Sequence, residues 1–285
     1  MMRFILCLTL TLAFLPISLA EASAPKPATC NTSTISDFNG SRDYVCLSYE
    51  NEKYIAYIGG VDYNPQHMYQ LFVKKQKIGD KTWSPVGKAS PIAEQTREVS
   101  LYVSEGVPYI AFTIININDV QSNTFKVMKY NNSSREWDNI SELEDQSADG
   151  WWTSKSLFVN DKDIYVAYKR SQESKIAVFR YNVENKEKEY LSRIPVGDDP
   201  QELKNSIDSV YIYYKDKTIY VGSQTEDNYS QITMVRQYDP NKKEWSIAKT
   251  AGEEIKIMRP LHAPKRPKTY DYQDWIKLFK IAELI

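Results

Sequence analysis

The sequence YIAY at residues 54–57 recurs as YIAF at 109–112, YVAY at 165–168 and YVGS at 220–223. Each copy holds a small residue in an apolar run, and successive small residues lie 55, 56 and 55 positions apart. A second landmark keeps this register at intervals of 54, 53 and 55: an aromatic residue behind a polar turn, at Trp83, Trp137, Tyr190 and Trp245. A fixed period of this length indicates repeated units that bury their faces against one another.

Each repeat is expected to contain four β-strands. The second strands are the runs quoted above, and their near-continuous apolar character is typical of strands covered on both faces. The expected first strands are VCLSY (45–49), SLYV (100–103), SLFV (156–159) and SVYIYY (209–214). The segments ENEK, SEGV, NDKD and KDKT join first and second strands and carry turn-forming residues, so each pair is a predicted hairpin.

The third strands, LFVKK, KVMKY, AVFRY and MVRQY, precede a fourth strand that begins at the aromatic landmark. Four antiparallel strands per unit are typical of a propeller blade. The sequence therefore predicts an all-β, four-bladed β-propeller over residues 42–258, with small residues where blades pack closely and mostly structural aromatic landmarks. The alternative is five blades, with a composite blade built from the N-terminal segment 21–41 and the EEIKIM strand at 253–258.

Residues 1–20 combine a short positive start with an apolar stretch that ends in small residues, the pattern of a cleaved secretory signal. A transmembrane helix is the alternative, but the run is short and contains Pro16. Once Cys7 leaves with the signal, Cys30 and Cys46 remain, and a pair of cysteines in an exported protein predicts a disulfide. Two unpaired thiols are the other possibility.

Six Asn-x-Ser/Thr sequons predict a glycoprotein if the source is eukaryotic. They begin at Asn31, Asn39, Asn131, Asn132, Asn139 and Asn228.

The composition, with 42% hydrophobic and 26% charged residues, is that of a folded protein with a full core. The net charge of -1 argues against nucleic-acid partners, which usually require a basic surface. His67 and His262 are the only histidines, and no cysteine lies near them, so we expect neither a zinc site nor a cofactor.

Residues 259–285 follow the repeats. The first part, 259–269, contains three prolines and is a predicted linker. Beyond it, apolar residues at helical spacing predict a short amphipathic helix that packs on the propeller flank or on a partner. These residues are Tyr272, Trp275, Leu278, Phe279, Ala282 and Ile285.

The loops between second and third strands are the first candidate site, because propeller ligands usually bind where such loops form a concave mouth. All four loops are acidic, and their acidic residues are Asp62, Asp119, Glu173, and Glu226 with Asp227. Converging carboxylates could bind a cation or serve a glycosidase as acid and base, whereas solvated loop acids are the simpler interpretation. Cations at the third-strand ends form a possible anion-binding ring: Lys74, Lys129, Arg180 and Arg236.

The segment Asp149-Gly150-Trp151-Trp152 before the third repeat is the clearest departure from the repeat pattern. An exposed Trp could stack on a sugar ring or a partner side chain, with Asp149 and Arg170 as hydrogen-bonding groups. The alternative is that both indoles fill a gap between blades.

The order of strand, turn, apolar strand, third strand and terminal Trp resembles the blades of fungal fucose-binding propeller lectins. The second strands carry no Arg for the sugar, so the resemblance assigns no sugar-site residue. We expect a secreted, non-enzymatic module that recognises a glycan or an extracellular protein, with Trp151, Trp152, Asp149, Arg170, Asp62, Asp119 and Asp227 as candidate ligand-binding residues. A propeller glycoside hydrolase and a structural or assembly protein are the alternatives.

Overall fold

The computed structural model describes thirteen stretches of the 285-residue chain. They are residues 25–28, 30–35, 38, 44–60, 69–87, 96–115, 123–145, 155–170, 175–195, 207–215, 217–226, 230–247 and 255–258. The strands in these stretches form four antiparallel sheets, each taken from one continuous part of the chain. The predicted all-β propeller of four blades is confirmed.

The blades follow the predicted repeats. Blade 1 contains β2 (Tyr44–Tyr49), β3 (Glu52–Gly60), β4 (Tyr69–Lys77) and β5 (Ser84–Pro85). Blade 2 contains β6 (Thr96–Ser104), β7 (Val107–Ile115), β8 (Asn123–Asn131) and β9 (Glu136–Asp145). Blade 3 contains β10 (Lys155–Asn160), β11 (Asp163–Arg170), β12 (Lys175–Asn182) and β13 (Glu187–Pro195). Blade 4 contains β14 (Ile207–Lys215), β15 (Thr218–Glu226), β16 (Ser230–Asp239) and β17 (Glu244–Ile247).

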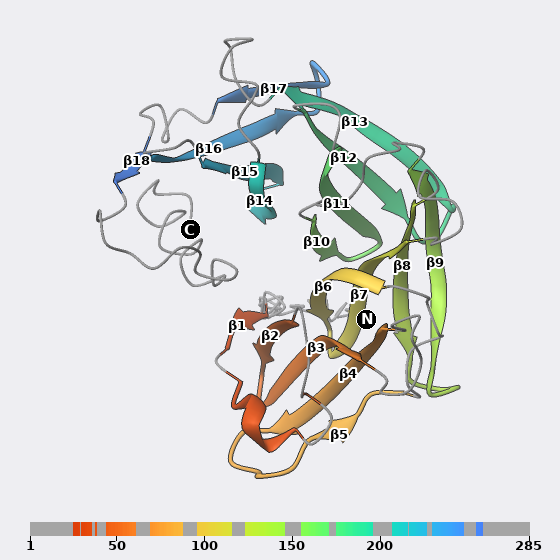
Figure 1. Ribbon diagram of the computed structural model, residues 1–285. Coiled ribbons are helices and arrows are strands. Elements are labelled where there is room, and N and C mark those ends of the chain that lie inside the picture. The colour runs from red at the N-terminus through yellow and green to blue at the C-terminus, as the bar shows by residue number, and fades with distance from the viewer. Residues whose placement is uncertain are drawn as a thin grey trace, which may run out of the picture.

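The four blades stand side by side around an axis, and in each blade the first strand of the repeat (β2, β6, β10 or β14) lies closer to the axis than the later strands (Figure 1). Two further strands extend the terminal blades. β1 (Lys26–Pro27) pairs with β2, and β18 (Ile255–Met258) pairs with β16 over residues 230–233, beyond the part that β17 covers. β17 and β18 thus share the outer edge of blade 4. The alternative of a composite fifth blade is wrong for these strands, because the N-terminal and C-terminal strands each join a different, existing blade.

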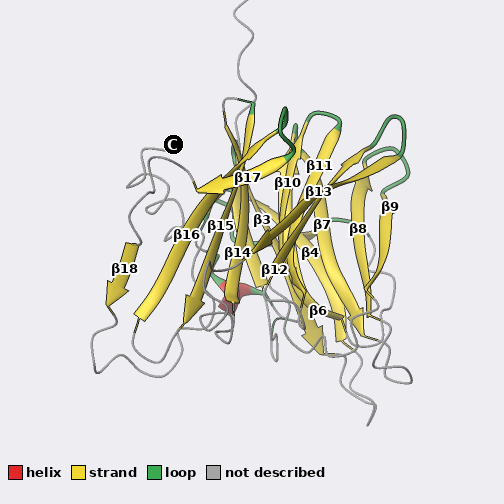
Figure 2. Ribbon diagram, turned by 90° about the horizontal axis from the view of Figure 1, so that it is seen from above, coloured by secondary structure: helices red, strands yellow, loops and turns green. Residues whose placement is uncertain are grey.

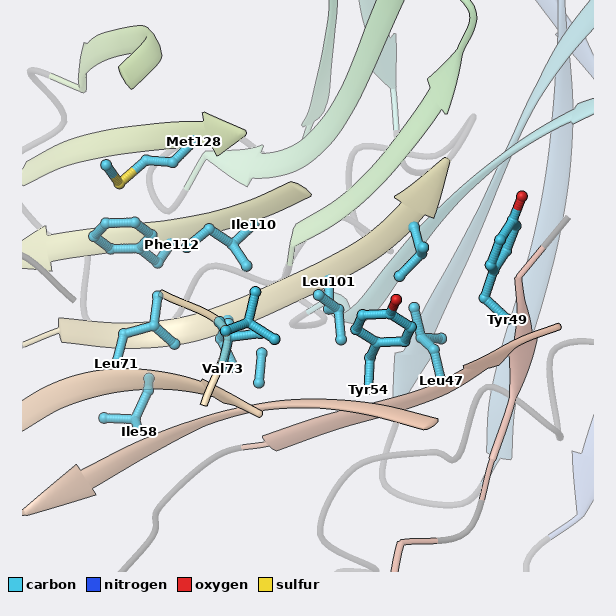
Figure 3. Close-up of a cluster of buried hydrophobic side chains, with 14 residues drawn as sticks. Leu47, Tyr49, Tyr54, Ile58, Leu71, Val73, Leu101, Ile110, Phe112 and Met128 are labelled. Atoms are coloured by element: carbon cyan, nitrogen blue, oxygen red, sulfur yellow. The ribbon is translucent and has the colours of Figure 1, made fainter. Parts of the chain in front are cut away.

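Each blade has a leading face toward the preceding blade and a trailing face toward the following one. Three hydrophobic clusters fill the spaces between consecutive blades. Figure 3 shows the first, in which Tyr54 and Ile58 of blade 1 lie in one layer with Leu101, Ile110 and Phe112 of blade 2. Burial of these apolar faces is the main stabilising contribution of the fold.

The small residues of the repeat lie on trailing faces. Ala56, Ala111 and Ala167 have no exposed surface, and each belongs to the cluster shared with the following blade. The backbone of each second strand can therefore approach the next blade closely. This is the structural reason for the first sequence landmark.

Tight turns join first and second strands as predicted. Glu50, Glu105 and Asp161 adopt positive φ of 50°, 50° and 52°. The left-handed conformation suits the twist of a short hairpin.

Four-residue turns join third and fourth strands in blades 2 to 4, and each is closed by an Asn or Asp side chain. The Oδ1 atom of Asn131 accepts hydrogen bonds from the backbone N–H groups of Ser133 and Ser134, at 3.0 and 3.3 Å. Asn182 and Asp239 accept the corresponding pairs in blades 3 and 4. Such side chains replace missing backbone partners and stabilise the turn.

The described part of the N-terminal segment, residues 30–35 and 38, covers the leading face of blade 1. The predicted disulfide between Cys30 and Cys46 is confirmed and joins the segment to β2. The short 3-10 helix η1 (Thr32–Thr34) precedes Ile35, which packs with Ile55 and Tyr57. Because Ile55 and Tyr57 are fully buried, the segment substitutes for a preceding blade.

Candidate functional site

The strands divide the propeller into two ends. One end, the turn face, carries the tight turns described above, which lie along the upper edge in Figure 2. The other end, the loop face, is where second strands end and third strands begin. The chain leaves and re-enters the strands there at residues 61–68, 116–122, 171–174 and 227–229, and between blades at 88–95, 146–154 and 196–206.

The predicted ligand-binding residues all map to connections of the loop face or to a strand end beside them. Asp62, Asp119, Asp149, Trp151, Trp152 and Asp227 lie outside the described residues, as does Glu173. Arg170 is the last residue of β11, and its backbone pairs with Lys175. The side-chain geometry of this group therefore remains a prediction, whereas the strand ends around it are defined.

The strand ends beside the Trp pair belong to blade 3. Lys155, the first residue of β10, pairs with Tyr168 of β11. Arg170 lies two residues farther along β11, about 7 Å at the rise of a strand, toward the end from which residues 146–154 enter β10. The start of β10 at Lys155 and the end of β11 at Arg170 thus lie at the same corner of the loop face.

The seam between blades 2 and 3 runs under this corner. The rings of Phe125 in blade 2 and Tyr168 in blade 3 stack with centroids 6.1 Å apart. Thr113 pairs with Phe125 across β7 and β8, is only 6% exposed, and its Oγ1 has no hydrogen-bond partner. A buried hydroxyl without a partner costs free energy, and in proteins such groups often mark a place where water or a ligand supplies the partner. Sequence reasoning missed Thr113, because nothing in its surroundings separates it from other strand threonines.

Ionisable groups at the turn face form closed contacts among themselves. In blade 1, Tyr54 donates a 2.6 Å hydrogen bond to Glu52, and Lys75 donates one of 2.9 Å to the same carboxylate. Burial, followed by the hydrogen bond to Glu52, raises the pKa of Tyr54 well above its ordinary value. Partial burial alone would raise the pKa of Glu52, but the hydrogen bonds from Tyr54 and Lys75 and the lysine charge lower it overall.

Blade 3 repeats this arrangement with other residues. Tyr165 lies 3.4 Å from Asp163, and Arg180 contacts both Asp163 and Glu189, at 3.8 and 3.5 Å. Burial and then the charge of Asp163 raise the pKa of Tyr165. Because cation, phenol and carboxylate satisfy one another in both blades, we assign these groups to stability.

The possible ring of matched cations is not formed. Lys74 pairs with Ile55 on the leading face of blade 1, whereas Lys129 and Arg180 lie on trailing faces. Arg236 pairs with Val221, which packs against blade 3, so it too is on a leading face. Successive residues of a strand point to opposite faces, so a shift of one position along the strand changes the face. Lys74 and Arg236 are therefore on the opposite type of face from Lys129 and Arg180.

The described residues hold no group of three or more His, Cys, Asp or Glu side chains that could bind a metal ion. In the same part of the chain, no helix has the length and hydrophobicity needed to cross a membrane.

Comparison with solved structures shows a likeness to a thermostable family-43 glycoside hydrolase, with 12% sequence identity and a TM-score of 0.50. The match covers 83% of this chain and 82% of that one. The GH43 endo-arabinanase from Bacillus licheniformis matches at 12% identity over 72% of this chain and 79% of that one, with a TM-score of 0.42. The GH93 α-L-arabinofuranosidase of Fusarium graminearum matches at 12% identity over 66% and 60%, with a TM-score of 0.47.

No protein-family model matches the sequence, and no curated protein matches it. The first of these structural likenesses supports the propeller fold. At 12% identity it identifies no activity for this chain.

Proposed function

We propose that this protein is an exported binding module that recognises a glycan, or a protein of an extracellular surface, on the loop face. The supporting observation is the asymmetry between the two ends. Hydrogen-bonded turns and satisfied ionic contacts occupy the turn face, while the non-repeated sequence with Trp151 and Trp152 connects two strand ends of the loop face. Binding residues are commonly carried on loops positioned by a rigid scaffold.

The proposed site lies where residues 146–154 meet the corner of blade 3. Trp151 or Trp152 would stack on the apolar face of a sugar ring or on a side chain of a protein partner. Asp149 and Arg170 would form hydrogen bonds with its polar groups. Asp62, Asp119 and Asp227 would extend the site across the loop face. The buried hydroxyl of Thr113 lies at the nearby seam between blades 2 and 3 and could donate a hydrogen bond to a bound group or accept one from it.

Export is part of the same proposal. The bridge between Cys30 and Cys46 is typical of oxidising compartments. Residues 1–20 would direct the chain there, and the sequons at its surface would accept glycans in a eukaryotic source. The similarity to fungal fucose-binding lectins concerns the order of strands in the blade, and we propose no fucose specificity from it.

A glycan array probed with the mature protein tests this function. For the best ligand found, Trp151→Ala or Trp152→Ala should weaken binding by about 1–3 kcal/mol and leave the melting temperature nearly unchanged. Trp245→Phe is the matched control, because it alters an indole between blades 3 and 4 and should reduce stability without changing affinity. A stability loss of about 3–5 kcal/mol with unchanged affinity in the folded fraction would instead place the Trp pair in the core.

A glycoside hydrolase is the second candidate function. The observation that favours it is that all four acidic connections leave the same end of the propeller. Hydrolysis would require two of the carboxyl groups of Asp62, Asp119, Glu173 and Asp227 to lie about 5–10 Å apart. Arabinan and chromogenic arabinofuranosides are the first substrates to assay, since enzymes named for this chemistry share the fold type.

The two functions separate in one experiment. A hydrolase would turn over a substrate, and replacing an essential carboxylate by its amide would abolish turnover but keep binding. A binding module would retain its ligand unchanged. If the protein neither binds nor cleaves glycans and binds no extracellular protein, a structural or assembly role would be favoured.

A further inference from the structure

The second strand of each repeat carries a tyrosine two residues before the small landmark, on the trailing face. In the first three blades this tyrosine is covered by the following blade: Tyr54, Tyr109 and Tyr165 are only 2%, 5% and 5% exposed. The equivalent residue of blade 4, Tyr220, is only half-buried. The trailing face of blade 4 is thus covered differently from the other three.

The composition of this face also departs from the repeat. Gly222 replaces the alanine, and Tyr211 stands where blades 2 and 3 have Ser100 and Ser156. Ser156 accepts a 3.1 Å hydrogen bond from the backbone N–H of Ile212 in the following blade, a contact that tyrosine could not provide in the same way. Together with Val235, which lies opposite Gly222, these residues form an apolar and aromatic patch on the face, next to Gln237, which pairs with Tyr220.

Blade 1 does not supply the missing cover through its apolar leading face. That face is already packed by Ile35 and Phe38 of the N-terminal segment. Among the described residues, no hydrophobic cluster joins blade 4 to blade 1. Yet Val235 is only 2% exposed, so something other than these faces lies over it.

The last described strand, β18, brings the chain to the edge of blade 4. β18 ends at Met258 beside Ser230, on the outer edge of blade 4. The predicted linker of 259–269 can span up to about 36 Å. A helix of residues 270–285 would be about 24 Å long, close to the length of a blade strand. A segment tethered at the edge of the face has a high effective concentration there.

We propose that residues 270–285 form an amphipathic helix whose apolar stripe lies on the trailing face of blade 4. Tyr272, Trp275, Leu278, Phe279 and Ala282 would cover Tyr211, Tyr220, Gly222 and Val235. The helix then covers the trailing face of blade 4, as residues 30–38 cover the leading face of blade 1. This proposal is independent of the ligand on the loop face.

Photocrosslinking of the full chain tests the location. Phe279 is replaced by the photoreactive residue p-benzoylphenylalanine, and crosslinked peptides are identified by mass spectrometry after irradiation. We expect crosslinks from position 279 to peptides of β14, β15 or β16 in a species of monomeric mass. The same photoreactive residue at Lys280, on the polar side of the helix, should give few or none of these.

Other products would overturn the proposal. Crosslinks to the same strands at dimeric mass would show that a second copy supplies the cover. Crosslinks confined to blade 1 or the loop face, or equal yields from positions 279 and 280, would place the segment elsewhere.

Hydrogen exchange provides a second measurement. Leu278→Glu puts a charge into the apolar stripe, and burying it is unfavourable. Amides of β14, β15 and β16 should then exchange about tenfold faster, while those of blade 2 stay unchanged. Lys277→Glu, on the polar side, is the matched control and should leave all rates as they were. Equal rates in the two variants would contradict the proposal.

Discussion

The indole nitrogen of Trp245 in blade 4 donates a hydrogen bond of 2.8 Å to the backbone carbonyl of Leu191 in blade 3. Trp137 of blade 2 makes the same kind of bond, of 3.1 Å, to the carbonyl of Val86 in blade 1. In both cases the terminal aromatic residue of a repeat binds the outer part of the preceding blade. The second sequence landmark therefore fixes blades to one another.

Trp83 of blade 1 has no blade before it and donates instead to Oγ1 of Thr34, at 3.2 Å. Residues 30–38 thus offer blade 1 both an apolar cover and the hydrogen-bond acceptor that a preceding blade would provide. Tyr190 of blade 3 is the exception among the four landmarks, since it is 61% exposed.

Trp245→Phe keeps an aromatic ring but removes the indole donor. We expect a loss of about 1 kcal/mol in the free energy of unfolding, the usual net value of a hydrogen bond. Tyr190→Phe is the control and should change stability much less, because its side chain is exposed. Urea denaturation of both variants measures the difference, and equal midpoints would argue against a stabilising role for the indole bond.

Ala111→Leu and Ala167→Leu should each destabilise the protein by about 1–3 kcal/mol. Both residues are fully buried on trailing faces, and extra methylene groups there force the blades apart. The melting temperature reports the loss. Ser246→Leu, at an exposed position of β17, serves as the control, and a similar small effect in all three variants would mean that the assigned blade faces are wrong.

Asn131→Ala should destabilise the turn between β8 and β9 by about 1 kcal/mol. The substitution removes the acceptor for Ser133 and Ser134 and a 3.0 Å donor bond from Nδ2 to Asp138. Asn132→Ala, at the exposed next position, is the matched control and should be nearly neutral. Both variants are compared by denaturation in protein made without N-glycosylation; a larger effect at position 132 would refute this assignment.

Glu52→Gln should reduce stability at pH 7 by up to about 1 kcal/mol, the scale of a partly exposed ion pair. The pKa of Glu52 is lower in the folded protein than in the unfolded chain. Its contribution is therefore complete above the ordinary pKa of a glutamate and is lost as the pH falls through the lower, folded value. The two proteins should converge in stability once the pH lies below that folded value.

Urea titrations of Glu52→Gln and the unaltered protein at pH 7 and at a series of lower pH values measure this convergence. Glu105→Gln, in an exposed turn, is the control and should show little difference at either pH. A constant gap between the Glu52 variant and the unaltered protein would mean that the carboxylate charge is not involved.

The repeat period and the small residues were sufficient to predict the propeller, because each repeat must satisfy the same packing against its neighbours. Ala56 and Ala111 could be recognised as buried since their surroundings recur at a fixed interval. The disulfide followed from the pairing of the two remaining cysteines. All these features depend on residue type and spacing, which the sequence displays directly.

Strand faces were harder to infer than strand positions. Lys74 and Lys75 are adjacent, and only the register with Ile55 and Tyr54 reveals which of them lies on the trailing face. The split outer edge of blade 4 also escaped prediction, because β17 and β18 are separated by residues 248–254. The candidate site residues fall in connections between strands or at a strand end, and loops have no periodicity from which side-chain positions follow.

Every sheet of this propeller is assembled from one uninterrupted stretch of chain, and the cover for blade 1 precedes it in sequence. No described strand from the C-terminus is needed to complete the first blade. Because the contacts within a blade are local, each blade can form soon after its residues leave the ribosome. Folding can then proceed in order from the N-terminus, with each finished blade serving as the surface on which the next one assembles.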